Sequence, residues 1–483
     1  MALKSMVLII ALKDTCTEVQ LLNSQAKVCA SATQEYSSHD QHADMISYDP
    51  IELLFHVRSA IQQVLQQAKQ CHIAHILICN HSQTAMYWDA DSGKPLSPVI
   101  GSTCLRGISS CRFFQNNHLA DDIYHKTGLP LSPSYLGIKC HWLNENFSDA
   151  FFSKKIMFGG FETWLLYQLS GKKAYCMSLC QASQSMLFNI SSCDWDPLLC
   201  SDCLPQNHLL PKVISDPSSI FAKTLHFMPL LDDIPITIIC HENKSKYWAC
   251  QHFNFSDLVI DFSAERFSLL SHSGHHFNKT NTRLPQHLIH RADDSLYLFK
   301  KTVELAPWPQ QLFPQLSTKL LSDTPISLEH IQHPQVIIHS TSLPRPSFGR
   351  PKQTLGILGL DATSSIDDLT WAFIAHRAFV LFEAIESLST VLSKSPQHLF
   401  FASHCLSSES YILCELLQRP LSCFYGPSWD LYGCLLLFQK QTSFFSELSL
   451  KKWLKSKTLL PNLDPITVYG LKQSWTQASS NTK

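Results

Sequence analysis

Glycine is scarce in this sequence, at 15 of 483 residues, which is about half of the usual 7%. Proteins that wrap their backbone closely around phosphate groups use glycine for that approach. The chain also contains no G-x-x-x-x-G-K-[ST], H-E-x-x-H or G-x-S-x-G motif. These absences argue against a P-loop nucleotide site, a zinc protease and a serine hydrolase of the α/β type.

The sequence also lacks a long apolar segment and a large net charge. Its N-terminal apolar run, Met6 to Leu12, ends at Lys13 and Asp14, well short of the ~20 residues that a membrane helix needs, and no small-residue cleavage site follows it. Lys and Arg total 38 against 39 for Asp and Glu, so no net field attracts nucleic acid or anionic lipid. We therefore expect a cytoplasmic protein that binds neither nucleic acid nor membranes.

Cysteine, in contrast, is frequent, with 18 residues. In a reducing compartment these thiols behave as small apolar groups and do not form a disulfide framework. Two groups of residues have the chemistry of metal ligands: Cys193, Cys200, Cys203 and His208, and His272, His275 and His276. For the first group we favour core thiols, because free cysteines are among the most often buried residues and pack as small apolar groups. For the second we favour a surface turn, because serine and glycine surround the histidines.

The order of apolar segments predicts an α/β fold. Three strands are expected first, at Val7 to Leu12, Val19 to Leu22 and Lys27 to Ser31. Helical spacing follows from Asp49, an N-cap with proline after it, to Ala68, and the next strand is Ile73 to Cys79. Strands and helices in this order are typical of a layered α/β domain.

A second α/β half is expected after about Ile234. Its predicted elements are strands near Ile236 to Ile239, Val259 to Phe262, Val336 to His339 and His398 to Phe401, and a helix from Ser365 to Leu392. No long linker or low-complexity segment separates the halves, so we expect two packed domains with a boundary near residues 235 to 255 and a ligand cleft between them.

Four segments of the first half carry a recognisable pattern: NHSQTAMYWDADSGKPLSP (Asn80 to Pro98), TGLPLSPSYLGIK (Thr127 to Lys139), FGGFETWLLYQLSG (Phe158 to Gly171) and ASQSMLFNISSCDWD (Ala182 to Asp196). In this order they resemble motifs of the glycerol kinases, members of the FGGY carbohydrate kinases. The C-terminal half resembles the family only in its hydrophobic outline. Trp164, in the ETWLL helix, is expected in the core of the first domain.

The resemblance implies two ribonuclease-H-like domains of the actin superfamily flanking a cleft, in agreement with the α/β order of the sequence. It implies an N-terminal kinase domain over residues 1–245, a divergent C-terminal kinase domain over residues 246–445, and a tail over residues 446–483. It further implies ATP and Mg²⁺ as cofactors and a polyol or sugar as the phosphate acceptor. A homo-oligomer is also compatible with it.

The first phosphate-binding hairpin of the family, Asp-x-Gly-Thr-Thr/Ser, corresponds here to ALKDTCTEV, which has no glycine. Lys13 or Asp14 lies near the acid position. The resemblance implies Asp14 as a surrogate metal ligand, with Asp14 and Thr15 next to the nucleotide. A cation at Lys13 would repel Mg²⁺.

The polyol-binding positions of the family are also changed. Its Arg-Glu pair corresponds to Ser82 and Gln83, and its tyrosine after the proline corresponds to Ser134, with Tyr135 next to it. The resemblance implies that these four residues would bind substrate hydroxyl groups, without the charges that the family uses.

The family's catalytic Gly-Asp-Gln-Gln segment resembles IPITIICHENKS, which puts Glu242 at the position of the catalytic base and Asn243 at a substrate-binding position. Glutamate keeps the charge but adds a methylene group, and a displacement of about 1 Å can reduce a rate about 10²-fold. The alternative is that His241 and Glu242 form a solvated loop without a catalytic role.

Further nucleotide-binding positions have lost the family's chemistry. The Gly-Thr-Gly turn corresponds to Ser263, Ala264 and Glu265, which adds a carboxylate where phosphate charge would lie. The Asp-Gly-Gly turn corresponds to Ala402 through His404, with Ser403 at its centre. Only Gly433 still resembles the helix on the adenine side.

Phosphoryl transfer depends on positioning and charge neutralisation, and the residues that supply both are the ones replaced. The sequence therefore predicts an FGGY-type kinase scaffold that phosphorylates a polyol or sugar weakly or not at all. The alternative function is that of a pseudokinase acting as a binding or regulatory protein.

Overall fold

The structure is a computed structural model of the 483-residue chain. It describes residues 4–38, 40, 44–68, 71–80, 83–151, 154–216, 219–229, 231–240, 258–262, 266–273, 285–291, 295–305, 336–342, 353–391, 396–403, 406–426, 429–453 and 455–480.

The chain forms two compact units, and both are discontinuous in sequence. Unit 1 comprises Met1–His252, Ser273–Phe299 and Asp430–Lys452, and unit 2 comprises Phe253–His272, Lys300–Trp429 and Trp453–Lys483. The first segment of unit 1 thus ends within the expected boundary region, and a short segment much later in the chain completes this unit.

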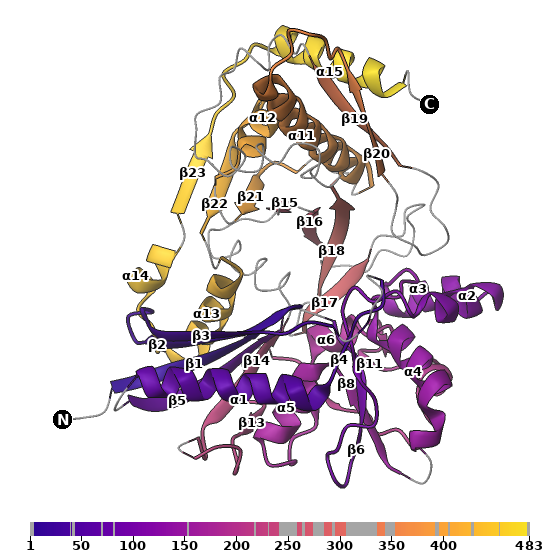
Figure 1. Cartoon of the computed structure of the whole chain (residues 1–483), viewed down its shortest axis with the longest axis vertical. Coiled ribbons are helices and arrows are strands. Elements are labelled where there is room, and N and C mark those ends of the chain that lie inside the picture. Colours follow the sequence, from indigo (N-terminus) through magenta and orange to yellow (C-terminus); the bar gives the residue numbers. More distant parts are fainter. Residues whose placement is uncertain are drawn as a thin grey trace. The chain divides into compact units, whose positions relative to one another are not determined.

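Figure 1 shows the sheet of unit 1, which comprises six strands within the described part of the chain. Their order across the sheet is β13 (Ala222–Lys223), β14 (Pro235–Cys240), β5 (Cys71–Asn80), β1 (Lys4–Leu12), β2 (Cys16–Asn23) and β3 (Val28–Glu35). β1 pairs antiparallel with β2 and parallel with β5, and β5 pairs parallel with β14. The four strands expected in this half of the chain are confirmed.

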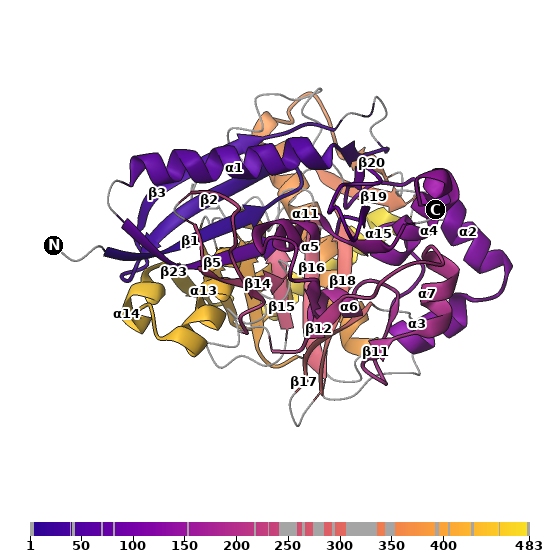
Figure 2. The ribbon, with the colours of Figure 1, turned by 90° about the horizontal axis from the view of Figure 1, so that it is seen from below.

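Helix α1 (Pro50–Gln67) covers one face of this sheet (Figure 2). Its start is fixed as the sequence predicts: Asp49 Oδ1 accepts hydrogen bonds from the backbone N–H groups of Ile51 (2.7 Å) and Glu52 (3.3 Å), and proline follows the cap. Leu53, Val57 and other apolar residues at helical spacing are buried against the sheet. Asp49 therefore begins the helix, and this apolar face docks it.

The same core contains α5 (Phe161–Leu169). Trp164 is 1% exposed, its indole N–H donates to the backbone oxygen of Gly93 (3.1 Å), and its ring lies 5.9 Å from that of Phe161. The expectation that Trp164 lies in the core of the first domain is confirmed.

The opposite face of the sheet contacts α13 (Trp429–Thr442), which belongs to the last segment of unit 1. The ring of Phe438 lies 4.7 Å from that of His75 on β5, and His75 Nε2 is 2.9 Å from the hydroxyl of Thr237 on β14. Burial lowers the pKa of His75 to about 4, so this histidine is neutral at pH 7 and packs as an apolar group.

The second sheet repeats the arrangement of the first. Its order is β17 (Gln286–Arg291), β18 (Ser295–Glu304), β16 (Arg266–Ser273), β15 (Leu258–Phe262), β21 (Leu399–Ser403), β22 (Leu421–Tyr425) and β23 (Lys455–Leu459). β15 pairs antiparallel with β16 and parallel with β21, and β21 pairs parallel with β22. In each sheet, one strand (β1 or β15) thus pairs antiparallel on one side and parallel on the other, and the next strand pairs parallel again. This repeated arrangement is expected for two ribonuclease-H-like domains.

The described residues of unit 2 include the helices α11 (Ile366–Val391), α12 (Ser408–Leu417) and α15 (Pro465–Ser480). Arg377 of α11 and Glu409 of α12 form a buried ion pair, with Nε and Oε1 3.1 Å apart. Glu415 of α12 accepts hydrogen bonds from the backbone N–H groups of Asn462 and Leu463, just before α15. These buried charged groups are therefore paired or hydrogen-bonded, as burial requires.

The other described elements are β4 (Ser47–Tyr48), β6 (Met86–Asp89), β7 (Val99–Ile100), α2 (Ile108–Asn116), α3 (Ala120–Thr127), α4 (Leu136–Phe151), β8 (Ile156–Gly159), β9 (Cys176–Ser178), α6 (Leu179–Ser183), β10 (Phe188–Asn189), β11 (Asp194–Trp195), α7 (Pro197–Cys203), β12 (Lys212–Ile214), β19 (Ile337–Ser342), β20 (Gln353–Leu358), α14 (Glu447–Leu450) and η1 (Lys451–Trp453). No helix in the described ranges has the length and apolarity to cross a bilayer.

Two strand expectations need correction. The strand near Ile236 to Ile239, expected to open the second α/β half, is β14 and completes the first sheet by parallel pairing with β5. The strand near Val336 to His339 is β19, which pairs only with β20 in a separate two-stranded sheet. Local apolar pattern predicts that a strand forms, but its partner depends on contacts far away in sequence.

The favoured interpretation of the cysteines holds in the described part of the chain. Cys200 and Cys203 are buried in α7, and burial raises the pKa of the Cys200 thiol to about 12, so both remain protonated core thiols. His272 lies in β16 and not in a turn, whereas His275 and His276 lie outside the described residues.

Candidate active site

The turn between β1 and β2 is held in place by two tyrosines. The backbone N–H of Lys13 donates to Cys16 O (3.0 Å) and closes the turn. The hydroxyl of Tyr36 donates to Lys13 O (2.6 Å), and that of Tyr48 donates to Asp14 O (2.7 Å). Side-chain hydroxyl groups thus bind the carbonyls of a turn that has no glycine.

The side chains of this turn are also engaged. Asp14 and Thr15 are exposed, and Asp14 Oδ1 accepts a hydrogen bond from the hydroxyl of Ser102 (2.6 Å). Lys13 Nζ lies 2.7 Å from Glu18 Oε2. The ion pair with Glu18 offsets part of the repulsion that Lys13 would exert on a cation near Asp14.

The space beside the turn is small. A cavity of about 10 Å³ is lined by Leu12, Lys13, Asp14, Tyr36, Tyr48, Leu53, Asn80, Thr84 and Phe161. This volume matches about one water molecule. The two tyrosine rings and Phe161 fill the inner side of the turn, so this cavity admits neither a polyol nor a phosphate group.

Lys139 of α4 is fully buried next to this turn. Its ammonium group donates to the backbone oxygens of Gln83 and Ser102, the latter at 3.2 Å. Burial lowers the pKa of Lys139 to about 7, while nearby Cys104 and Asp14 act in the opposite direction. Lys139 thus joins the Gln83 segment and the Ser102 segment next to Asp14, and it carries a positive charge for part of the time at pH 7.

Gln83, expected at a position that binds substrate, has a partner within unit 1. Its Nε2 donates to Oε1 of Gln184 (2.5 Å), and Gln184 lies just after α6. This bond occupies one of the two donors of the Gln83 amide. Ser82, the other residue of the expected clamp, lies outside the described residues.

Ser134 and Tyr135 lie immediately before α4. Ser134 is half-buried and its backbone N–H contacts the hydroxyl of Ser132 at 3.3 Å. Tyr135 is buried, and burial raises the pKa of its phenol, with Cys111 of α2 and Tyr124 of α3 close enough to raise it further. Tyr135 is therefore a protonated, buried phenol at pH 7, and substrate binding by either residue remains a prediction.

Glu162, in the ETWLL segment, is a buried carboxyl group at the start of α5. Oε1 accepts hydrogen bonds from the Gln181 amide and from the Thr163 hydroxyl (3.3 Å). Burial raises the pKa of Glu162 to about 7 despite these donors, and Oε2 has no hydrogen-bond partner among the described residues. Glu162 connects α5 to α6 and is partly protonated at pH 7.

Two expected nucleotide-binding residues are described in separate parts of the chain. Ser403 is the last residue of β21 in unit 2, is buried, and accepts a hydrogen bond at its backbone oxygen from Gly426 N (3.3 Å). Gly433 is buried within α13, in the last segment of unit 1. Their contact with a nucleotide remains a prediction.

The other expected site residues lie outside the described residues: Glu242, Asn243, Ser263 and Ala264, together with Glu265 and His404. The roles of Glu242 as the base and Asn243 as a substrate ligand therefore remain predictions.

The structure adds Lys139, Glu162 and Gln184 to the residues around Asp14 and Gln83. Each lies in a segment that the motif pattern predicts to be helical or similar to the family, and family motifs alone do not distinguish these polar residues from their apolar neighbours. A lysine within the apolar run YLGIKC and an acid within FGGFETWLL are the signs that could have found them, because a charged residue in a buried stretch requires partners.

The comparisons with known proteins agree with the motif pattern. Residues 6–246 match the N-terminal domain of the FGGY family of carbohydrate kinases. The chain belongs to this family. A glycerol kinase from Halothermothrix orenii is 26% identical over 262 residues, covering 53% of this chain and 52% of the relative. One from Leptospira biflexa is 29% identical over 249 residues, covering 50% of each chain. The chain thus spans about half the length of the curated FGGY relatives that it matches.

Solved structures extend the likeness in fold to both units. The crystal structure of Plasmodium falciparum glycerol kinase with ADP has a TM-score of 0.82 at 18% identity, covering 98% of this chain and 97% of that one. A gluconate kinase from Lactobacillus acidophilus has a TM-score of 0.76 at 16% identity, covering 98% and 96%. At these identities the likeness establishes the FGGY fold over the whole chain and leaves the chemistry open.

Proposed function

We propose that this chain is a glycerol-kinase-like FGGY protein in which phosphoryl transfer to a polyol or sugar is weak or absent. The observation that carries the proposal is the turn at Asp14. In place of a glycine-rich turn whose N–H groups face phosphate, the chain has Lys13, Asp14 and Thr15, two tyrosines that bind the turn carbonyls, and a cavity of about 10 Å³.

The donors near Asp14 fit Mg²⁺ poorly. Mg²⁺ prefers several oxygen ligands in octahedral geometry, whereas Asp14 is the one carboxylate described at this turn that is not ion-paired, and it already accepts a bond from Ser102. Within the described ranges, no three His, Cys, Asp or Glu side chains are grouped so that they could hold a metal ion. We therefore assign no step of a reaction to a metal held by these residues.

The residues near the polyol position support the same proposal. The Arg-Glu pair of the family is replaced by Ser82 and Gln83, and the side-chain amide of Gln83 donates a hydrogen bond to that of Gln184. A neutral amide that is already paired binds a hydroxyl group less strongly than a free charged side chain. The acceptors to be tested are glycerol, gluconate and xylulose, which the names of the similar kinases mention.

A melting experiment with Mg·ATP tests the proposal. At 1 mM nucleotide, a site with a dissociation constant of about 10 µM would stabilise the protein by ~2.7 kcal/mol, which corresponds to a rise of several degrees for a chain of this size. We expect a rise of less than about 1 °C, as for a dissociation constant of about 1 mM or weaker.

The matched control is Asp14→Asn, which removes the charge of the described turn carboxylate that is not ion-paired. We expect the same small response to Mg·ATP in this variant and in the wild type. A rise of several degrees in the wild type that Asp14→Asn abolishes would mean that the turn binds Mg·ATP, and the proposal would be wrong.

A further inference from the structure

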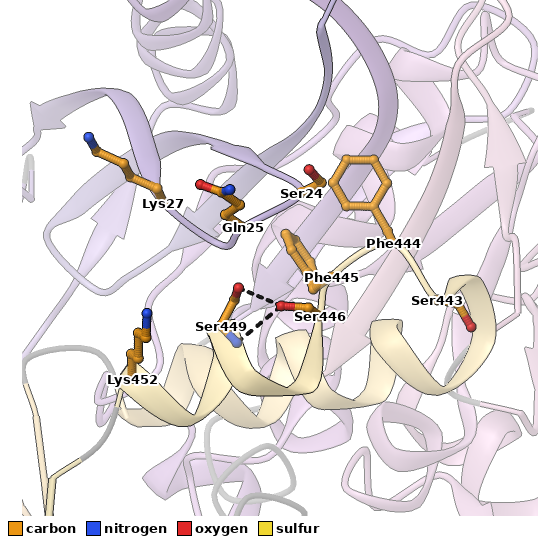
Figure 3. A pocket seen from close by; sticks show the side chains of 9 residues that line it. All are labelled: Ser24, Gln25, Lys27, Ser443, Phe444, Phe445, Ser446, Ser449 and Lys452. Carbon is orange, nitrogen blue, oxygen red and sulfur yellow. Dashed lines mark hydrogen bonds between the residues drawn. The ribbon is translucent and has the colours of Figure 1, made fainter.

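Unit 1 contains a second, larger pocket at the other end of β2 (Figure 3). It has a volume of about 720 Å³ and lies between the β2–β3 turn and the segment from the end of α13 to η1. Its lining residues are Ser24, Gln25, Lys27, Ser443, Phe444, Phe445, Ser446, Ser449 and Lys452. The volume falls in the range of pockets that bind small organic molecules.

Both walls of this pocket are held by hydrogen bonds. Asn23 Oδ1 accepts from the backbone N–H groups of Gln25 (2.9 Å) and Lys27 (3.1 Å), which fixes the β2–β3 turn. On the other wall, Gln439 Oε1 of α13 accepts from Phe445 N (2.6 Å). The pocket is therefore formed before a ligand arrives, which lowers the entropy cost of binding.

The polar lining suits an anion. Lys27 and Lys452 are exposed at the pocket, and within the described part of the chain neither ammonium group has a hydrogen-bond or ion-pair partner. Four serine hydroxyl groups line the same space, and none of the lining residues carries a carboxylate. Two unpaired ammonium groups with hydroxyl donors are the chemistry that binds phosphate.

The other end of the pocket is aromatic. Phe444 is half-buried, and its ring lies 5.0 Å from that of Phe445 and 6.3 Å from that of Phe438. Figure 3 shows Phe444 on one side of the pocket and both lysines on the other. A ligand that spans the pocket would therefore combine a charged end with an apolar or planar end.

We propose that this pocket binds a small phosphorylated metabolite, with its phosphate between Lys27 and Lys452 and its organic part against Phe444. The site is separate from the turn at Asp14, because the eight residues of β2 lie between them, an extended length of about 27 Å. Binding here does not require that the chain transfer phosphate, so it is a function that a weak or inactive kinase could retain.

The test uses phenyl phosphate as the probe, with inorganic phosphate and phenol as partial probes, in calorimetric titrations of the full chain at low salt. We expect phenyl phosphate to bind with a dissociation constant below about 1 mM and the partial probes to bind at least about threefold more weakly, since each reaches one end of the pocket. The double variant Lys27→Gln/Lys452→Gln should weaken phenyl phosphate binding at least about tenfold.

The matched control is Lys155→Gln/Lys173→Gln, which removes the same charge at exposed positions of unit 1 outside the pocket. All four lysines are exposed, so neither double variant is expected to unfold the chain. The proposal is overturned if phenyl phosphate does not bind at about 10 mM, or if the two double variants weaken binding equally.

Discussion

Replacing Trp164 by alanine is expected to lower the free energy of unfolding by about 3 to 5 kcal/mol. The side chain is 1% exposed in the core that joins α1, α5 and the first sheet, and its N–H donates to Gly93 O. Alanine would remove the buried ring, leave a cavity and remove one of the two hydrogen bonds that Gly93 O accepts, since the Gln168 amide also donates to this carbonyl (3.0 Å). Urea denaturation followed by circular dichroism measures the loss.

Phe55→Ala is the control for Trp164→Ala. Phe55 lies on α1 but is 66% exposed, so the same kind of truncation should change the free energy of unfolding by less than about 0.5 kcal/mol. A Trp164→Ala variant as stable as Phe55→Ala would show that the ETWLL helix does not pack as described.

The second large effect concerns Lys139 and pH. The folded-state pKa of about 7 lies below the ordinary value of 10.5, so between these values the unfolded chain binds more protons than the folded chain. The contribution of Lys139 to stability therefore rises with pH from about 7 to about 10 and is constant below 7. The pKa difference corresponds to about 5 kcal/mol over the full range from about 7 to 10.5.

Lys139→Met keeps the length of the side chain and removes its charge. Let the stability difference be the free energy of unfolding of the variant minus that of the wild type, measured by urea denaturation. We expect this difference to be about 3 to 4 kcal/mol larger at pH 6 than at pH 9.5. An equal difference between variant and wild type at the two pH values would contradict a buried, neutralised lysine.

Glu162→Gln is the control for the pH experiment, because its effect has the opposite sign and another window. Burial raises the pKa of Glu162 from 4.5 to about 7, so the folded chain binds the extra proton and stability falls as pH rises from about 4.5 to 7. The free energy of unfolding of the glutamine variant should therefore rise relative to that of the wild type between pH 4.5 and about 7. It should show no further relative change between pH 7.5 and about 9.5.

The sequence predicts the first half of the fold well because its signals are local. Asp49 and Pro50 define the start of α1, and apolar alternation defines β1, β2 and β5. The motif around Trp164 predicts burial correctly for the same reason. Each of these features depends on residues within one or two turns of the chain.

The placement of α13 could not be predicted in this way. The resemblance at Gly433 implies a helix here, but the docking of this helix on unit 1 depends on the contact between Phe438 and His75, which lie in opposite halves of the chain. Similarly, the apolar run of β14 predicts a strand, whereas its membership of the first sheet depends on pairing with β5.

The candidate active site also depends on contacts that local sequence patterns do not predict. Family motifs pointed to Asp14 and Gln83, and both lie near Lys139. The buried lysine itself, and the tyrosines that fill the space under the turn, act through contacts between segments far apart in the sequence. A list of replaced motif residues predicts that the chemistry is altered, but it does not predict what occupies the space instead.

The account is tested most directly by phosphoryl transfer itself. Radiolabelled ATP with Mg²⁺ would be incubated with the chain and with each of glycerol, gluconate and xylulose, with Glu242→Gln as the matched variant at the position expected for the base. The account predicts the same labelled product for the wild type, for Glu242→Gln and for the reaction without protein, to within about tenfold of background. Transfer that exceeds background by more than about tenfold, increases with acceptor concentration, requires Mg²⁺ and is lost in Glu242→Gln would contradict it.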